Sequence, residues 1–194
     1  MPELSSEMWT HRYSNDETGW DIGYISPPLK NYVDTLDNKE LRILIPGGGN
    51  GYEAEYLWQK GYKNVVLLDW SEVPLKAFAA KNVDFPTQHL VCGDFFLHQG
   101  SYDLILEQTF FCAIEPSLRA AYAKKMHELL KPGGRLVGVL FNVTFSKEGP
   151  PFGGSAAEYR GYFEPYFEFR HFETCYNSIP PRAGNELFVE LISK

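Results

Sequence analysis

Four of the five residues at positions 47–51 are glycines, and they stand between an apolar run and an amphipathic one in LIPGGGNGYEAEYL. A glycine-rich turn from a strand into a helix lets the backbone approach a ligand closely, and it leaves helix N-terminal N–H groups pointing at that ligand. Gly49, Gly51 and Ala54 also match the loose dinucleotide-binding pattern G-x-G-x-x-[GA]. The turn therefore indicates a nucleotide-like ligand, with a purely structural turn as the alternative.

An acidic residue further along the chain fits the same kind of site. Asp69 ends the next apolar run, about 20 residues after the glycines, where a carboxylate can accept hydrogen bonds from both hydroxyls of a ribose. Capping of the following helix is the alternative role, but Ser71 already suits that position. Asp69 is therefore predicted to contact the ligand.

Other reactive side chains give weaker signals. Cys112 lies in the run FFCAI, but no histidine is close to it in the sequence, so we do not predict a catalytic nucleophile there. The five histidines show no ligand spacing with cysteines or carboxylates, and no metal site is predicted. Arg182 stands in the turn PPRAGN, where a solvated loop charge is the favoured interpretation and contact with an anionic ligand is the alternative.

Apolar periodicity places these residues on alternating strands and helices. Strands are expected at 41–46, 64–69, 89–94, 102–108 and 135–141, and helices at 52–60, 72–82 and 117–130. Such alternation predicts an α/β fold with a parallel sheet covered on both faces. After a short helix near 155–163, strands at 167–173 and 185–192 have no helix between them, so they must pair as antiparallel neighbours or leave the sheet.

The 194 residues predict a single domain that is long enough to bury a core without disulfides. Residues 41–194 are expected to form this core. Residues 1–40 are aromatic and polar, with Trp9, Tyr13 and Trp20 but no clear strand. We predict a flap over the site, and packing against the sheet is the equally weighted alternative.

Composition limits the partners and the compartment. A formal charge of -7 with scattered basic residues disfavours nucleic acid, because phosphate binding needs clustered lysine and arginine. The three widely spaced cysteines fit neither a disulfide framework nor a metal knuckle, which favours a reducing, cytoplasmic setting. Neither a membrane span nor a signal peptide is evident. We expect a small-molecule partner, no membrane, and a monomer or homodimer.

Three motifs together resemble S-adenosyl-L-methionine-dependent methyltransferases. IPGGGNG is similar to the first motif of these enzymes. CGDFF at 92–96 is similar to the segment whose acidic residue and its neighbour hold the adenine, and KPGG before a strand is similar to a further signature of the superfamily. This superfamily also adds an antiparallel seventh strand to its sheet. The resemblance implies a single Rossmann-like class I methyltransferase domain, with a mostly parallel seven-stranded sheet, helices on both faces and an antiparallel last strand.

Longer segments resemble the thiopurine S-methyltransferase family, particularly its thiol and halide methyltransferase branch. They are MWTHRYSNDETGWDIG at 8–23, TFFCAIEPSLRAAYA at 109–123 and GPPFGGSAAEYRGYF at 149–163. The resemblance implies that residues 1–40 fold over the cofactor and that 149–152 lies on the acceptor side. Glu107 and Gln108 replace the Asp-Arg pair of animal thiopurine enzymes, which favours a small nucleophile. Cofactor contacts are then expected from Trp9, Tyr13, Trp20, Gly47, Gly49, Gly51, Asp69, Trp70, Asp94, Phe95, Glu107 and Gln108, and acceptor contacts from Phe110, Phe111, Phe152 and Arg182.

The implied chemistry is methyl transfer from S-adenosyl-L-methionine to a small thiol, bisulfide, thiocyanate or halide. Aromatic faces and the Glu107 carboxylate would attract the positive sulfonium. An acceptor that is already an anion needs no general base, so no catalytic residue is predicted. Aromatic thiols such as thiopurines are the alternative acceptors, and a nicotinamide oxidoreductase or a non-catalytic cofactor-binding module is a less favoured function.

Overall fold

The computed structural model describes residues 4–147 and 149–194, and within them seven strands form one sheet. Residues 1–3 of the predicted flap and Glu148 lie outside the described residues. The strands are β1 (Ile43–Pro46), β2 (Val65–Asp69), β3 (Leu90–Cys92), β4 (Tyr102–Gln108), β5 (Leu130–Phe141), β6 (Phe167–Thr174) and β7 (Glu186–Ser193). The α-helices are α1 (Ser6–Ser14), α2 (Pro27–Asp34), α3 (Tyr52–Gln59), α4 (Glu72–Lys81), α5 (Arg119–Leu129) and α6 (Ala156–Phe163).

The order of the strands across the sheet is β3-β2-β1-β4-β5-β7-β6. The pairs among β1 to β5 are parallel, whereas β7 is antiparallel to both β5 and β6. This arrangement confirms the predicted mostly parallel sheet and the predicted antiparallel pairing of the last two strands.

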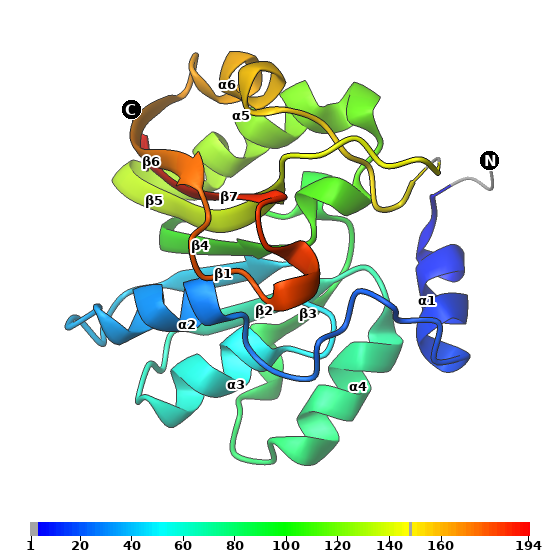
Figure 1. The fold of residues 1–194 in the computed structure, drawn as a ribbon. Helices are drawn as coiled ribbons and strands as arrows, with labels where there is room; N and C mark the ends of the chain where they lie inside the picture. Colours follow the sequence, from blue (N-terminus) through cyan, green and yellow to red (C-terminus); the bar gives the residue numbers. More distant parts are fainter. Residues whose placement is uncertain (1–3, 148) are drawn as a thin grey trace.

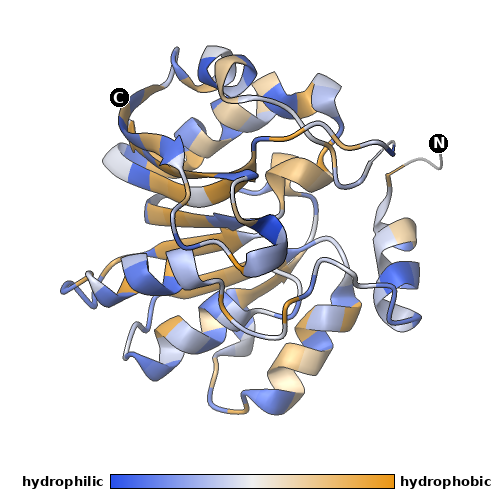
Figure 2. Ribbon diagram, viewed as in Figure 1, coloured by the Kyte–Doolittle hydropathy of each residue, from blue (hydrophilic) through white to orange (hydrophobic). Residues whose placement is uncertain are grey.

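Helices cover both faces of the sheet (Figure 1). One apolar cluster packs α2, α3 and α4 against one face, with Leu29, Leu57 and Phe78 among its buried side chains. The other cluster packs α5 and α6 against the opposite face through Tyr122 and Phe163. The central strands are apolar almost throughout, as Figure 2 shows, because both of their faces are buried. No helix in the described residues is long and apolar enough to cross a membrane.

Two segments differ from the sequence-based expectations. β5 begins at Leu130 and includes Lys-Pro-Gly-Gly, which was expected to be a turn before the strand; the ladder to β4 jumps from Leu130 to Arg135 across this bulge. The predicted strand at 89–94 is only three residues long, with short 3-10 turns at Thr87–His89 and Phe95–Leu97 on either side.

Residues 4–40 contain two helices with different roles. α2 buries Leu29 and Val33 in the core against α3 and β5, so the part of the predicted flap around this helix belongs to the core. α1 buries no residue and lies apart from the body of the sheet in Figure 1. The hydroxyls of Thr10 and Ser71 lie 2.9 Å apart and connect α1 to the start of α4.

Candidate active site

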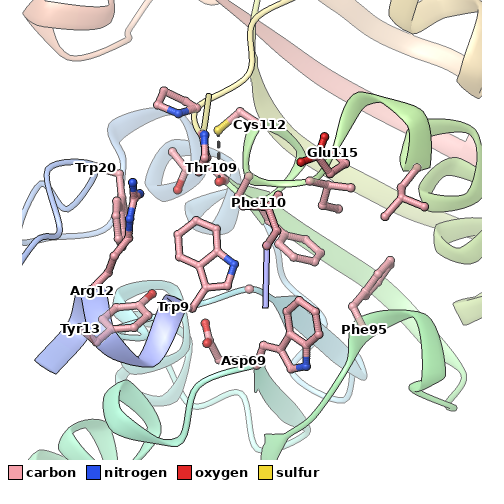
Figure 3. A pocket seen from close by; sticks show the side chains of 18 of the residues that line it. Trp9, Arg12, Tyr13, Trp20, Asp69, Phe95, Thr109, Phe110, Cys112 and Glu115 are labelled. Atoms are coloured by element: carbon pink, nitrogen blue, oxygen red, sulfur yellow. Dashed lines mark hydrogen bonds between the residues drawn. The ribbon is translucent and has the colours of Figure 1, made fainter. Parts of the chain in front are cut away.

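The turns that follow β1, β2, β3 and β4 meet around one cavity of about 790 Å³. They lie at the carboxyl ends of the parallel strands. The chain adds β2 and β3 on one side of β1 and then crosses back to add β4 on its other side, so the strand order reverses at β1. Open α/β sheets bind ligands at such a switch point. Gly47, Asp69, Asp94 and the segment after β4 line the cavity. Trp9, Arg12, Tyr13 and Trp20 of the N-terminal segment line it too, and Figure 3 shows them together on one side, with Phe95 on the other.

At specific positions of the glycine turn, a side chain would not fit. Gly47 has φ +58°, and a Cβ there would lie 2.2 Å from Phe110 Cδ2. Gly49 has φ +50°, and its Cβ would lie 2.6 Å from the Tyr13 hydroxyl. Gly51 differs, because its Cβ would meet Phe78 of α4 and Leu67 of β2, neither of which lines the cavity. Gly47 and Gly49 therefore shape the site, whereas Gly51 allows the helix to pack on the sheet.

Asp69 joins the glycine turn to the start of α4. Its Oδ2 accepts a hydrogen bond from Gly49 N at 2.9 Å, and its Oδ1 accepts one from Ser71 N at 2.8 Å. Burial raises the pKa of Asp69, and these backbone donors oppose the shift. Each carboxylate oxygen has a further lone pair. Asp69 lines the cavity, so these lone pairs are available to hydroxyl groups of a ligand. Ser71 caps α4, as expected, by accepting from Val73 N.

The segment after β3 forms the next part of the cavity. Asp94 lines it and caps the turn that follows, since its Oδ1 accepts from Phe96 N at 2.8 Å. Capping therefore uses one oxygen and leaves Oδ2 for a ligand. Phe95 is almost buried, with its ring 5.2 Å from Phe110, and Trp70 is 39% exposed at the rim. These flat apolar surfaces beside a carboxylate suit a heteroaromatic ring with an exocyclic amine.

The N-terminal aromatic residues form a cluster over the glycine turn. Trp20 makes edge-to-face contacts with Trp9 and Tyr13, at ring-centroid distances of 5.5 and 5.7 Å. The Arg12 guanidinium lies over both tryptophan rings, 5.5 and 5.7 Å from their centroids. Burial and the nearby Asp69 charge raise the pKa of Tyr13, so its hydroxyl is neutral. Trp9, Tyr13, Trp20 and Arg12 all line the cavity.

Arg182 connects the flap to the other end of the sheet. Its Nη2 donates to the Trp20 carbonyl oxygen at 2.7 Å, and its Nη1 lies 3.7 Å from Glu186 Oε1. The side chain is only 12% exposed and lines the cavity. The favoured interpretation of a solvated loop charge was therefore wrong. The reason is that the turn before β7 folds back over the site and buries the guanidinium.

The segment after β4 forms the apolar end of the cavity. Thr109 has φ +58°, an unfavourable conformation for a β-branched residue, and this turn directs Phe110 and Cys112 into the cavity wall. The Cys112 thiol donates to the Thr109 carbonyl oxygen at 3.2 Å, and burial raises its pKa. A neutral, hydrogen-bonded thiol is a poor nucleophile. Ala113, Ile114, Leu118, Phe141, Phe145, Pro150 and Pro151 also line this end, and Glu115 is its acidic residue (Figure 3).

Several residues expected to contact ligands lie elsewhere. Phe111 is 1% exposed and packs against Tyr122 and Tyr159 in the core, since it points away from the cavity on its short 3-10 turn. Phe152 is not in the cavity lining, to which its loop contributes Pro150 and Pro151. Gly49 and Gln108 line a small recess of about 50 Å³ next to the main cavity. The residues that line both are Tyr13, Trp20, Gly47, Thr109 and Arg182.

Glu107 was expected to contact the cofactor, but it is fully buried behind the segment that follows β4. Its Oε1 accepts hydrogen bonds from Phe110 N at 2.8 Å and Phe111 N at 2.9 Å. Its Oε2 has no partner among the described residues. Burial raises the pKa of Glu107 to about 7. Since this carboxyl does not line the cavity, it cannot face a sulfonium there; it holds the turn that carries Phe110.

Sequence reasoning missed Arg12, Thr109 and Phe145 among the lining residues. Arg12 follows Trp9 by three positions on α1, so helical periodicity places both on one face and could have identified it. Nothing in the local sequence marks the strained backbone of Thr109. In the described residues, no group of three or more histidine, cysteine, aspartate or glutamate side chains is arranged to hold a metal ion.

Comparison with known proteins gives consistent results. A model of the thiopurine S-methyltransferase family matches residues 4–190. The chain is 33% identical over 192 residues to a protein named "Probable thiol methyltransferase 2" from Arabidopsis thaliana, covering 96% of this chain and 84% of that protein. It is also 33% identical over 193 residues to Thiocyanate methyltransferase 1 from Brassica oleracea, covering 96% and 85%.

Solved structures support the fold. The structure of magnesium protoporphyrin IX methyltransferase (ChlM) from Synechocystis PCC 6803 with bound SAM is similar, with a TM-score of 0.73 and 14% identity over 100% of both chains. The class I methyltransferase fold is thus confirmed. With a family model that spans nearly the whole sequence and relatives above 30% identity, this chain belongs to the thiopurine S-methyltransferase family.

Proposed function

We propose that this chain transfers a methyl group from S-adenosyl-L-methionine to a small thiol, bisulfide, thiocyanate or halide ion. As a member of its family, the chain is an S-adenosyl-L-methionine-dependent methyltransferase. The observation that carries the choice of acceptor is the division of one cavity into two ends. Asp69, Asp94 and the N-terminal aromatic residues line the end at the glycine turn, whereas the segment after β4 and Phe141, Phe145, Pro150 and Pro151 line a mostly apolar end. The largely buried Arg182 contacts both, through the Trp20 carbonyl oxygen and the Phe141 ring.

The first end fits the cofactor. Gly47 and Gly49 allow the lining residues Phe110 and Tyr13 to pack directly on the backbone of the turn, where a Cβ would clash with them. The Asp69 and Asp94 carboxylates have lone pairs for hydroxyl and amine donors. The ring faces of the N-terminal aromatic cluster would attract a positively charged sulfur. When bound, S-adenosyl-L-methionine supplies an electrophilic methyl group on such a sulfur. We therefore assign this end to the cofactor.

The second end favours a soft anion of small size. Its walls are mostly apolar, with Glu115 as the acidic residue of the segment after β4, and Arg182 lies with its guanidinium carbon 5.6 Å from the centre of the Phe141 ring. An anion loses hydration in such a place, and a guanidinium compensates by pairing with it. Thiolates, bisulfide, thiocyanate and iodide are weakly hydrated enough to enter. The relatives named for thiol and thiocyanate methyl transfer support this choice.

The side chains around the cavity offer no strong base for the acceptor. Among the described residues that line it there is no histidine, and the raised pKa values of Tyr13 and Cys112 keep these groups protonated at neutral pH. The carboxylates that line it, those of Glu17, Asp69, Asp94 and Glu115, are of a class that is a far weaker base than a thiolate. An acceptor must therefore lose its proton before it binds. The work of the protein is to align the acceptor with the methyl group and to exclude water, for which the flap and its link to Arg182 are suited.

Aromatic thiols are the second candidate acceptors. The cavity of about 790 Å³ lies well within the range of pockets for drug-sized ligands, so a thiopurine is not excluded by size alone. A nicotinamide cofactor fits less well, since Gly51, part of the dinucleotide pattern, serves helix packing here. We further propose a monomer or homodimer that acts in the cytoplasm without nucleic acid, in keeping with the formal charge of -7 and the three free thiols.

Calorimetry and steady-state kinetics test the proposal. S-adenosyl-L-methionine should bind and NAD should not. With the cofactor saturating, kcat/KM should be higher for thiocyanate, bisulfide or iodide than for a thiopurine, and Arg182→Met should reduce kcat/KM for thiocyanate more than for a neutral thiol. A higher kcat/KM for the thiopurine would make the second candidate correct. Cofactor binding with no turnover of any acceptor would indicate a non-catalytic module.

A further inference from the structure

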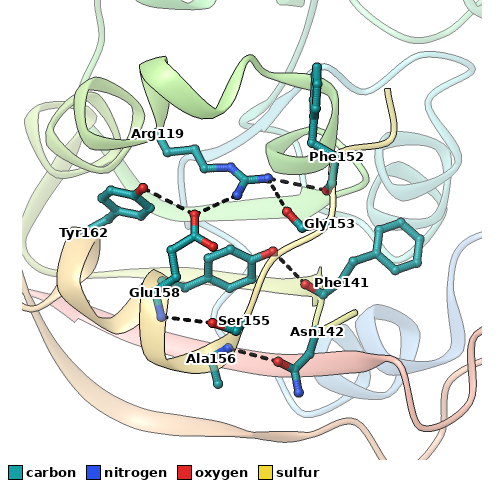
Figure 4. A network of polar contacts seen from close by, with 10 residues as sticks. Arg119, Phe141, Asn142, Phe152, Gly153, Ser155, Ala156, Glu158 and Tyr162 are labelled. Carbon is teal, nitrogen blue, oxygen red and sulfur yellow. Dashed lines mark hydrogen bonds and ion pairs between the residues drawn. The ribbon is translucent and has the colours of Figure 1, made fainter. Parts of the chain in front are cut away.

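Arg119, the first residue of α5, is a buried cation outside the cavity. Its side chain is 1% exposed. Nη1 lies 2.9 Å from Glu158 Oε1, and Nη2 donates to the carbonyl oxygens of Gly153 at 2.9 Å and Phe152 at 3.4 Å (Figure 4). A buried guanidinium is costly unless it is paired in this way, and its planar fork can reach all three acceptors at once.

The two carbonyl groups that Arg119 binds belong to the loop that carries Pro150 and Pro151 into the cavity wall. The backbone of this loop is held on its other side as well. Phe152 N donates to the Cys112 carbonyl oxygen at 2.7 Å, and Gly154 N donates to the Val143 carbonyl oxygen at 2.9 Å. At Gly153, a Cβ would lie 2.0 Å from the same Val143 oxygen, so the backbone fits there only without a side chain.

The same guanidinium also contacts the segment after β4. Its carbon lies 4.8 Å from the centre of the Phe111 ring and 5.3 Å from that of Tyr159. Phe111 stands between Phe110 and Cys112, which both line the cavity. Arg119 is therefore hydrogen-bonded to the loop that carries Pro150 and Pro151, and it packs against Phe111 in the segment that carries Phe110 and Cys112.

We propose that Arg119 is a positioning residue for the methyl acceptor, which fixes the 149–155 loop against the Phe111–Ala113 turn and so sets the shape of the apolar end. Glu158 assists by holding the charge of Arg119 from α6. Arg119 itself does not line the cavity. Because the loop that it holds forms part of the apolar end, replacement of Arg119 should affect the acceptor and leave cofactor affinity unchanged. The assignment of the apolar end to the acceptor rests on the function proposed above.

Four variants test this role. Arg119→Lys keeps the charge and loses the fork, and Glu158→Ala removes the partner from a half-exposed position where folding is less at risk. Glu158→Gln keeps an acceptor oxygen. Lys124→Met is the matched control, because Lys124 lies on the same helix, is 61% exposed and pairs only with Glu128 among the described residues. The measurements are S-adenosyl-L-methionine affinity by calorimetry, kcat and KM for thiocyanate, and hydrogen exchange of residues 149–155.

In Arg119→Lys and Glu158→Ala, kcat/KM for thiocyanate should fall about ten- to hundredfold, because a small displacement of an acceptor wall is enough for such a loss. Cofactor affinity should change less than about twofold, Glu158→Gln should recover most of the activity, and the control should match wild type. Exchange at 149–155 should accelerate in the two impaired variants alone. An equal loss of cofactor affinity, or unchanged kinetics and exchange, would overturn the proposal.

Failure of the proposed function would give a different pattern. If the wild-type chain binds the cofactor but methylates no small anion, the function is wrong and the kinetic comparison cannot be made. The exchange measurement still decides the structural part. Faster exchange at 149–155 in Arg119→Lys, but not in Lys124→Met, would support the role in fixing the loop, and equal exchange would refute it.

Discussion

Replacement of Glu107 by glutamine should make the protein more stable at alkaline pH. Glu107 is fully buried, its Oε1 accepts two backbone N–H groups, and its Oε2 has no partner among the described residues. Glutamine retains an oxygen acceptor for Phe110 N and Phe111 N and removes the charge. The substitution therefore isolates the effect of ionising a buried carboxyl behind the active-site wall.

The sign follows from the pKa values in the two states. Burial raises the pKa of Glu107 from 4.5 to about 7, so between these values the native state binds more protons than the unfolded state. The free energy of unfolding must then fall as pH rises through this window. One pKa unit corresponds to about 1.4 kcal/mol, so the loss between pH 4.5 and pH above 7 is about 3 kcal/mol.

Urea unfolding at pH 5, 6, 7 and 8 measures this effect. The stability of Glu107→Gln relative to wild type should increase by about 2.5 kcal/mol between pH 5 and pH 8. Glu53, also fully buried with a pKa raised to about 7 by burial, should give a similar trend as Glu53→Gln. The exposed Glu128→Gln is the control and should show none. If the difference between Glu107→Gln and wild type is the same at every pH, Glu107 ionises normally and the argument is wrong.

Three further predictions concern the cavity. Asp69→Ala should weaken cofactor binding by about 1.5–3 kcal/mol, because a carboxylate that bonds Gly49 N and faces the cavity is lost; unchanged affinity in calorimetry would exclude Asp69 from the site. Gly47→Ala should abolish most cofactor binding, since its Cβ would lie 2.2 Å from Phe110 Cδ2; Gly61→Ala, where φ is also positive but no atom lies within 4 Å, should leave the affinity unchanged. The ratio of kcat/KM for a thiol to kcat/KM for iodide should rise with pH up to the pKa of the free thiol; a constant ratio would show that the protein supplies a base.

Much of the fold could be predicted because its strands are apolar on both faces and end at polar residues. β1, which is followed by the glycine turn, and β2, which ends at Asp69, are examples. The predicted ranges 41–46 and 64–69 agree with both strands to within two residues. The bulge at the start of β5 could not be foreseen, because Lys-Pro-Gly-Gly has the composition of a turn and its inclusion in the strand depends on pairing with β4. The core role of α2 depends likewise on tertiary contacts.

The site was predictable where a residue directly follows a strand. Asp69 and Asp94 were found in this way, and the structure puts both in the cavity lining. The family resemblance implied contacts from Glu107 and Phe111, and both side chains are instead buried beside the turn at Thr109, whose φ is positive. Glu107 accepts from the backbone of this turn and Phe111 packs in the core, so residues that are neighbours in sequence lie on opposite sides of the cavity wall.

Headspace gas chromatography of the purified chain tests the central claim most directly. The chain is incubated with S-adenosyl-L-methionine and, in separate vials, thiocyanate, iodide, bisulfide or a small thiol. We expect a volatile methylated product in at least one vial, in amounts equal to the S-adenosyl-L-homocysteine formed. Cofactor binding without a methylated product in any vial would contradict it.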